Sequence, residues 1–587
     1  MKRIKIPALF IASLIGLMSC SRDFLRPEPL SFFTAENVFV DKAGFVAQLV
    51  TLRKVLNREQ TSQKNFLAHQ WAASEAGVPW LVGNIDWRNL TPTSDANQRF
   101  VTQINDMYQF VKYANVIISR IDNIEWPSEA ERNEILAEAL WHRSYWYYRM
   151  VGNYGDIPFV GREVTGAKLD FNTHSRWAIL DKLQQDMEWA VEWMVESASP
   201  GTPTKGAGNH LLAKIYLANM QWEQAVAAAT RVINGPYALM RQRFGQDADD
   251  PNKNVIWDLH RPDNKNLPQN TETILAFVDR FDVPDAARSA GLYTMRVYNP
   301  SFFNINNARD NAGGIGFIDA GPMYDSLGRG NPDVVLSDWH SYDIWADGDY
   351  DWKTTPDLRR ADVNWYDREE YFYNNPSSTQ YGQPFDPNNL PIPEEAWARI
   401  YPTPFYKIYQ PNHPEHAGQP MGGHGDWYIF RLAETYLLRA EAHYWNENPA
   451  AAAADINVVR ERAGASSISA ADVTIDFIFD ERARELFGEE PRQNELNRVS
   501  YIMAAKGING YSLSNIASNN WFYDRVHGLN QIYTRPGLSR VAHIEPYHFQ
   551  WPIDDAMINA NVLGTINQNI GYIGAERNRP PLETIEE

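Results

Sequence analysis

The chain has 587 residues, a net charge of −19 and a single cysteine, and 44% of its residues are hydrophobic. This length and hydrophobic content suit one large domain or two intertwined ones, since ~100–200 residues per domain is usual. The negative charge argues against binding to nucleic acid or to anionic lipid head groups, because both carry phosphate charges that a partner must neutralise. With one cysteine, no disulfide can form within the chain, so its stability must come from the core.

The first twenty residues combine a basic start, a short apolar run and the cysteine. Three basic residues precede an apolar run over residues 6–17, which is shorter than the ~20 residues that span a bilayer and is typical of a signal peptide. The run ends in Leu17-Met18-Ser19-Cys20, which has the pattern of a lipobox. We therefore expect residues 1–19 to be a signal peptide and residues 20–29 a lipidated tether. Acylation of Cys20 by more than one chain would anchor the protein stably, as its only membrane contact.

Helical periodicity dominates much of the remaining chain. Apolar residues recur at helical spacing over residues 177–194, and Thr173 and Ser175 are candidate caps for that helix. Asn448 and Pro449 suit the start of another helix, and Gly464 suits its end. The same periodicity predicts helices around residues 211–216, 222–232 and 432–444. We predict a mostly α protein in which helical pairs stack in the manner of tetratricopeptide repeats.

The centre of the chain, residues 237–424, has a different composition. It is rich in Pro, Gly, Asn, Asp and aromatic residues and shows little periodicity, apart from a candidate strand at residues 271–278. Ordered loops of this length inside a compact protein are usually functional. The sequence therefore predicts that the helical scaffold carries a large irregular loop layer.

Two loop segments have the composition of a sugar-binding surface. Sugars present apolar C–H faces ringed by hydroxyl groups, so flat aromatic side chains flanked by Asp, Asn and Arg suit them. The candidate ligand-binding residues are Trp80, Asp86, Trp87, Arg88 and Asn89 in the first segment, and Trp339, Trp345, Tyr350 and Trp352 in the second. A protein with 20 tryptophans buries many of them, and an individual loop tryptophan packs in the core more often than not. An aromatic side chain that is exposed on a loop is a better candidate for ligand binding than a buried one, because a large apolar surface left exposed usually has a function.

The sequence gives little support to a metal site or to catalysis. The aspartates of residues 343–351 offer the hard oxygen ligands that calcium prefers, but they lack the spacing and the closing glutamate of an EF-hand. The His-Glu-x-x-His, Gly-x-Ser-x-Gly and Walker motifs are absent. We expect no cofactor, with calcium as a weak alternative, and no catalytic residue.

Five segments, in order, resemble the SusD/RagB family of outer-membrane nutrient-binding lipoproteins. They are residues 137–160 (AEALWHRSYWYYRMVGNYGDIPFV), 208–239, 430–464 (beginning FRLAETYLLRAEAHYW), 478–498 (IFDERARELFGEEPRQNELNR) and 551–572 (WPIDDAMINANVLGTINQNIGY). The sequence departs from the family pattern at Glu490, Glu495 and Ile570. The resemblance implies a SusD-like fold, with an N-terminal helical region at residues 30–236 and a C-terminal one at residues 425–587.

The same resemblance implies a function and a partner. Members of the family bind nutrients, mostly glycans, at the cell surface and deliver them to a SusC-like TonB-dependent transporter in the outer membrane. Their ligand sites are built mainly from loops after the first helices and from central loops, where both candidate segments lie. In members of the family that are exported to the cell surface, several acidic residues usually follow the lipidated cysteine. Here Asp23 is the only acidic residue close to Cys20.

The charged residues of 478–498 have a structural interpretation. Glu481 and Glu485 lie on the same face of a predicted helix, so the two carboxylates could form a catalytic pair. The neighbouring Arg482, Arg492 and Arg498 favour fixed ion pairs instead.

Three functions remain open from the sequence: a glycan-binding lipoprotein, a glycoside hydrolase with an aromatic-lined cleft, and a helical-repeat scaffold that binds only proteins. A hydrolase would need two carboxylates ~5–9.5 Å apart across the scissile bond. The tryptophan-rich loops count against a pure scaffold. The ligand itself stays open among starch, plant or host glycans, and peptide.

Overall fold

The computed structural model describes residues 35–61, 66–79, 87, 90–93, 98–284, 288–301, 308–389, 400–410, 420–534 and 544–586. The predicted signal peptide, Cys20 and the tether lie outside these ranges. Among the described residues, no helix combines the length and the apolar character needed to cross a membrane.

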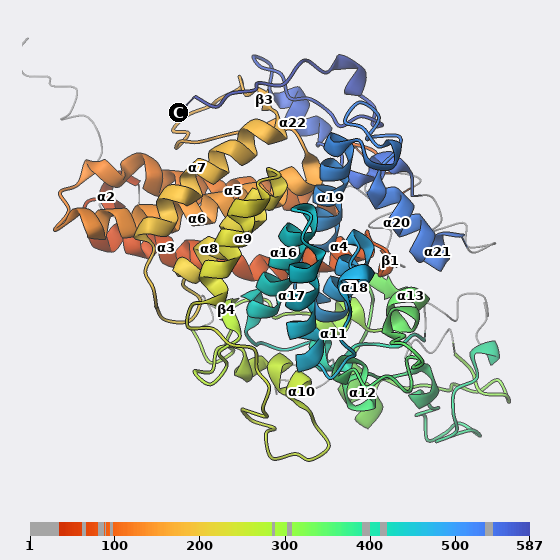
Figure 1. Cartoon of the computed structure of the whole chain (residues 1–587). Coiled ribbons are helices and arrows are strands. Elements are labelled where there is room, and N and C mark those ends of the chain that lie inside the picture. The colour runs from red at the N-terminus through yellow and green to blue at the C-terminus, as the bar shows by residue number, and fades with distance from the viewer. Residues whose placement is uncertain are drawn as a thin grey trace, which may run out of the picture.

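Antiparallel helical pairs form the N-terminal part of the scaffold, in red to yellow in Figure 1. In chain order, α5 packs on α6, α6 on α7, α7 on α8 and α8 on α9. The helices of this part are α2 (Ala35–Val38), α3 (Lys42–Val55), α4 (Phe66–Ala72), α5 (Gln98–Arg120), α6 (Glu129–Tyr154), α7 (Arg176–Trp193), α8 (Lys205–Ala218) and α9 (Trp222–Ile233). This arrangement confirms the predicted stacking of helical pairs.

Local sequence sets the ends of several helices. The Ser175 hydroxyl accepts a hydrogen bond from the backbone N–H of Ala178 and so begins α7, as predicted. The Asn448 side chain and Pro449 begin α17 in the same way. Gly464, at a φ of 77°, lies just beyond the end of that helix, in a conformation that a side chain would strain.

The central region is inserted between two helices that are neighbours in the stack. Helix α9 ends at Ile233, yet it packs against α16 (Leu432–Trp445), about 200 residues later in the chain. Strand β4 (Thr273–Phe277) of the central region pairs antiparallel with β6 (Trp427–Arg431), which leads directly into α16. The chain thus leaves the stack after α9, builds the central region and returns through β6. The predicted strand at residues 271–278 is β4.

The central region is held together by short elements and ordered loops, in green in Figure 1. Strand β1 (Gly77–Pro79) pairs antiparallel with β5 (Val334–Leu336) and so fixes the region to the end of α4. Outside the central region, in the N-terminal part of the chain, β2 (Ile157–Pro158) pairs antiparallel with β3 (Thr173–His174). The helices of the region are α10 (Val255–His260), α11 (Thr294–Tyr298), α12 (Pro322–Leu327), α13 (Asp338–Ser341) and α15 (Phe405–Ile408). This is the predicted irregular loop layer.

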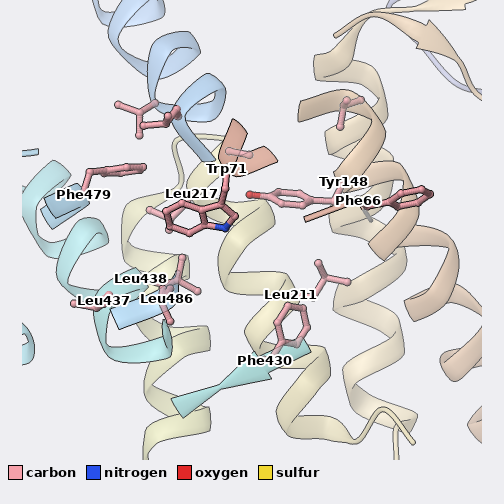
Figure 2. Close-up of a cluster of buried hydrophobic side chains, with 14 of the residues drawn as sticks. Phe66, Trp71, Tyr148, Leu211, Leu217, Phe430, Leu437, Leu438, Phe479 and Leu486 are labelled. Carbon is pink, nitrogen blue, oxygen red and sulfur yellow. The ribbon is translucent and has the colours of Figure 1, made fainter. Parts of the chain in front are cut away.

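The C-terminal helices complete the scaffold around one large core. They are α16, α17 (Pro449–Arg462), α18 (Ile475–Leu486), α19 (Arg492–Lys506), α20 (Trp521–Leu529), α21 (Gln531–Thr534) and α22 (Asp555–Ala560). Figure 2 shows the core where α4, α6, α8, α16 and α18 meet, with Trp71, Tyr148, Leu211 and Leu438 among its fully or almost fully buried side chains. The helical tryptophans Trp141, Trp146, Trp189, Trp193, Trp222 and Trp445 belong to this core or pack against it, which confirms their assignment to packing.

Candidate functional site

The structure separates the predicted ligand-binding residues into three groups. Trp80, Asp86, Arg88 and Asn89 lie outside the described residues. Trp87, Trp339 and Trp345 are buried. Trp352 is partly exposed, and Tyr350 is 48% exposed. Among the candidates that the structure describes, only this last pair has the accessible surface expected of a sugar-binding aromatic residue.

The expectation that Trp87, Trp339 and Trp345 are exposed platforms is wrong. The indole N–H of Trp345 donates to the carbonyl oxygen of His340 at 2.9 Å, and that of Trp87 donates to the hydroxyl of Tyr533 at 3.2 Å. Trp339 packs 5.5 Å from the guanidinium of Arg525. Each of these rings fills interior space, and the two N–H groups find partners there, which is how buried tryptophans are usually accommodated.

A partly exposed pair of rings remains beside α13. The rings of Tyr342 and Trp352 lie with their centroids 4.8 Å apart and their planes at 55°. Together with the neighbouring polar side chains Asp338, Asp343, Arg368 and Gln531, we call this pair the aromatic patch. Tyr350 belongs to the same loop, whose turn is closed by backbone hydrogen bonds of 3.1 Å between Asp347 and Tyr350.

A buried arginine fixes the indole of Trp352. The guanidinium of Arg360 lies 4.6 Å from the Trp352 ring and 4.5 Å from the ring of Trp365, so it is sandwiched by two indoles. It also forms an ion pair of 2.7 Å with Asp367. Cation–π contacts of this kind strengthen when they are shielded from water. Trp352 is therefore held in place before any ligand arrives.

The polar side chains of the patch are held in position as well. Arg368 lies 5.6 Å from the Tyr342 ring and forms an ion pair of 3.2 Å with Asp338. Gln531 donates to the carboxylate of Asp343 at 2.9 Å. Burial raises the pKa of Tyr342 to about 12, so its hydroxyl is protonated at neutral pH and can both donate and accept hydrogen bonds. The patch thus brings two partly exposed aromatic rings together with carboxylate, guanidinium, amide and phenol groups.

Helix α21 links Trp87 of the first predicted segment to residues of the second. Its Gln531 bonds to Asp343 and accepts from the backbone N–H of Trp339 at 3.3 Å, while its Tyr533 accepts from Trp87. Sequence reasoning did not identify Gln531 or Arg368. No local pattern could have indicated Gln531, because 188 residues separate it from Asp343.

The aspartates considered for calcium are engaged by the protein itself. Asp347 forms an ion pair with Arg460 at 2.8 Å and accepts from the backbone N–H of Ser466. Asp351 accepts from backbone and side-chain groups of its own turn at 2.8–3.0 Å. Among the described residues, no group of three or more His, Cys, Asp or Glu side chains could hold a metal ion. Calcium binding here therefore stays a prediction without structural support.

The charged residues of α18 and α19 form a buried ionic network, as the sequence analysis predicted. Glu481 pairs with Arg359, Arg460 and Arg484, and Glu485 pairs with Arg359, Arg431 and Arg462. Burial opposes ionisation of Glu481, but the three arginines outweigh it and lower its pKa to about 2. A carboxyl that is always ionised, buried and saturated with arginines cannot donate a proton to a substrate.

Arg482, Arg492 and Arg498 belong to the same kind of network. Arg498 binds both carboxylate oxygens of Glu441 at 2.7 Å. Glu490 and Glu495, where the sequence departs from the family pattern, pair with these arginines at 2.6 Å (Arg482–Glu490 and Arg492–Glu490) and 2.9 Å (Arg498–Glu495). The segment is scaffold, and its departures from the family pattern are accommodated by ion pairs.

Known proteins match most of the chain. The family model described as the SusD family matches residues 281–572, and a second model, described as starch-binding associating with outer membrane, matches residues 33–217. The SusD-like protein P25 of Formosa agariphila is 23% identical over 502 residues, which cover 80% of this chain and 79% of that protein. The SusD-like protein P38 of the same bacterium is 23% identical over 89% of this chain and 96% of its own length.

Solved structures share the fold. A laminarin-binding SusD-like protein superimposes with a TM-score of 0.57 at 18% identity, over 91% of this chain and 100% of its own. The surface glycan-binding protein A of Bacteroides uniformis gives a TM-score of 0.60 at 16% identity, over 89% of this chain and 98% of its own. The helical pairs, the inserted central region and these matches agree: the chain belongs to the SusD family.

Proposed function

We propose that this protein binds a glycan at the outer surface of the outer membrane and passes it to a SusC-like TonB-dependent transporter. The observation that carries the proposal is the aromatic patch, a preorganised pair of partly exposed rings with a polar rim in the central region. The family description of starch binding in association with the outer membrane supports it. So do the names of the similar structures, which are a laminarin-binding and a surface glycan-binding protein.

The patch suits sugar recognition for a physical reason. The C–H faces of a pyranose ring can leave water by packing on Trp352 and Tyr342, and rigid aromatic side chains lose little conformational entropy on binding. The hydroxyl groups around the same sugar can then bond to Asp338, Asp343 and Gln531. Binding of this type needs no covalent step, which agrees with a protein that captures its ligand without altering it.

A glycoside hydrolase is the alternative that the patch itself raises. Asp338 and Asp343 lie at the same surface, and burial together with the charge of Asp338 raises the pKa of Asp343. We favour binding because Asp338 is paired with Arg368 and Asp343 accepts from Gln531, so both carboxylates already have partners. Incubation with polysaccharides distinguishes the two functions. Release of reducing ends that is lost in Asp338→Asn and Asp343→Asn would establish hydrolysis and contradict simple binding.

The proposal is tested with soluble protein that begins after Cys20. A glycan array identifies the ligand, and isothermal titration calorimetry then measures its affinity. Truncation of a central aromatic residue at an interface typically costs more than ~2 kcal/mol. At ~1.4 kcal/mol per tenfold, we expect Trp352→Ala and Tyr342→Ala each to weaken binding by more than tenfold.

Tyr381 supplies a matched control. It is a 57% exposed tyrosine of the central region that is not part of the patch, so Tyr381→Ala should bind with wild-type affinity. If Trp352→Ala and Tyr342→Ala fold normally and bind the selected glycan as tightly as Tyr381→Ala does, the patch is not the site.

Anchoring and delivery belong to the same proposal. The lipobox supports attachment through Cys20, and family membership supports the transporter as partner. Recovery of the transporter with this protein from solubilised outer membranes would test delivery. Surface exposure is tested by protease treatment of intact cells.

A further inference from the structure

An apolar cavity of about 270 Å³ lies between α5, the segment that follows β2, and the C-terminal residues around α22. It shares no residue with the aromatic patch. Its walls include Tyr108 and Val111 of α5, Val160 and Phe171 of the segment after β2, and Met557 and Ile566 of the C-terminal part. A dry apolar cavity of about 150 Å³ can take up benzene. This cavity is therefore large enough for a phenyl ring with a short side chain.

The mouth of the cavity carries positive charge. Lys112 and Arg162 both line it and both are exposed. Within the described part of the chain, neither side chain forms an ion pair or a hydrogen bond, and no acidic residue lines the cavity. Two unpaired cations beside an apolar cavity stand out in a protein with a net charge of −19. They favour a ligand that carries a negative charge at one end.

A buried amide adds a polar group to the wall. Asn115 is 1% exposed and donates to the carbonyl oxygen of Val160 at 2.6 Å. Its side-chain oxygen has no hydrogen-bond partner among the described residues, although it is buried. A buried acceptor without a partner is costly. Because Asn115 lines the cavity, a ligand with an O–H or N–H group can supply the missing donor.

We propose that this cavity is a second binding site, which takes a small aromatic molecule with a carboxylate at one end and a hydrogen-bond donor on the ring. The ring fills the apolar cavity, the carboxylate meets Lys112 and Arg162, and the donor reaches the side-chain oxygen of Asn115. A mostly apolar pocket with a few converging polar groups is the usual form of a small-molecule site. The site is independent of glycan binding at the aromatic patch.

Three related probes test the three elements of the site by titration calorimetry. 4-Hydroxycinnamate has the ring, the charge and the donor; cinnamate lacks the donor; and 4-hydroxycinnamamide lacks the charge. We expect 4-hydroxycinnamate to bind most tightly. Cinnamate should bind about five- to tenfold more weakly, which is the usual effect of one buried hydrogen bond. The amide should bind a few-fold more weakly, and this difference should shrink in high salt.

Substitutions then assign the binding to the cavity. Lys112→Gln combined with Arg162→Gln should abolish the preference for 4-hydroxycinnamate over its amide, while the preference over cinnamate remains. Val164 is a partly exposed residue of the cavity lining, so Val164→Trp should fill the cavity and abolish binding. Val562→Trp is the matched control, because Val562 is 69% exposed and is not part of the lining. It should bind like the wild type.

Several outcomes would overturn the proposal. One is the absence of saturable binding of 4-hydroxycinnamate to the wild type at millimolar concentration. Another is equal binding of all three probes, or binding that survives Val164→Trp. A third is a dimer in sedimentation analysis that Val164→Trp disrupts, which would assign the cavity to a second copy of the chain. Trp352→Ala should leave probe binding unchanged, so failure here is distinct from failure of the proposed glycan site.

Discussion

Removal of Arg492 should destabilise the protein without affecting its ligand site. Arg492 is fully buried, forms an ion pair of 2.6 Å with Glu490 and pairs with Glu75. Burial opposes ionisation of Glu75, but Arg492 and Arg525 together lower its pKa to about 2. Arg492→Ala therefore leaves two buried carboxylates with fewer positive partners.

The expected loss is large for one substitution but moderate for a chain of this size. Breaking a buried ion pair by removing one partner costs about 3–5 kcal/mol. Arg525 still pairs with Glu75, and Arg482 with Glu490, so we expect the lower end of that range. An unfolding entropy of ~2.1 cal/mol/K per residue then gives a fall in Tm of roughly 2.5 °C.

Calorimetry on the soluble protein measures the effect, with two comparisons. Arg577→Ala removes an exposed arginine whose carboxylate partner, Glu576, is 3.8 Å away, and Tm should not change. Glu75→Gln combined with Arg492→Met removes both charges, leaves Arg525 with Asp476 and Asp480, and should lose less than the sum of its single variants. A Tm for Arg492→Ala within 1 °C of wild type, or loss of glycan affinity at unchanged Tm, would refute the reasoning.

Three further predictions concern anchoring, acid stability and the buried indoles. Cys20→Ala should prevent incorporation of radioactive palmitate and release the protein from membranes; continued incorporation would exclude the lipobox. Acid should lower Tm in two steps. Burial lowers the pKa of His340 and His548 to about 3, so the unfolded chain takes up protons first and stability falls as the pH drops below about 6.5. Arginine-paired carboxylates such as Glu481, with a pKa of about 2, add a steeper loss below about pH 4.5. A flat Tm between pH 7 and pH 4 would contradict this. Trp345→Ala should lower Tm because it creates a cavity, and Trp→Ala in a core costs about 3–5 kcal/mol. The affinity for glycan per folded molecule should stay unchanged. A selective loss of affinity in titration calorimetry would show that Trp345 belongs to the binding site.

Local sequence patterns were enough to predict the helical scaffold. The caps at Ser175 and Asn448, the stop at Gly464 and the spacing of apolar residues predicted α7, α16 and α17 nearly to the residue. They also predicted fixed ion pairs for the charges of residues 478–498, although other segments supply many of the partners, such as Arg359 and Glu441. These features can be predicted because capping and amphipathic periodicity act over a few residues, and because so dense a run of opposite charges needs internal partners.

Which aromatic residues are accessible depends on the tertiary packing. Trp345 ends a short 3-10 helix (Asp343–Trp345), and Trp352 follows seven residues later, yet Trp345 is buried and Trp352 is partly exposed. Trp87 is buried against Tyr533 of helix α21, which lies 446 residues away in the sequence. Gln531 of the same helix positions Asp343. The cavity beside Asn115 likewise joins α5 to the far end of the chain. Burial depends on which distant segments pack together, and no local pattern in the sequence records that choice.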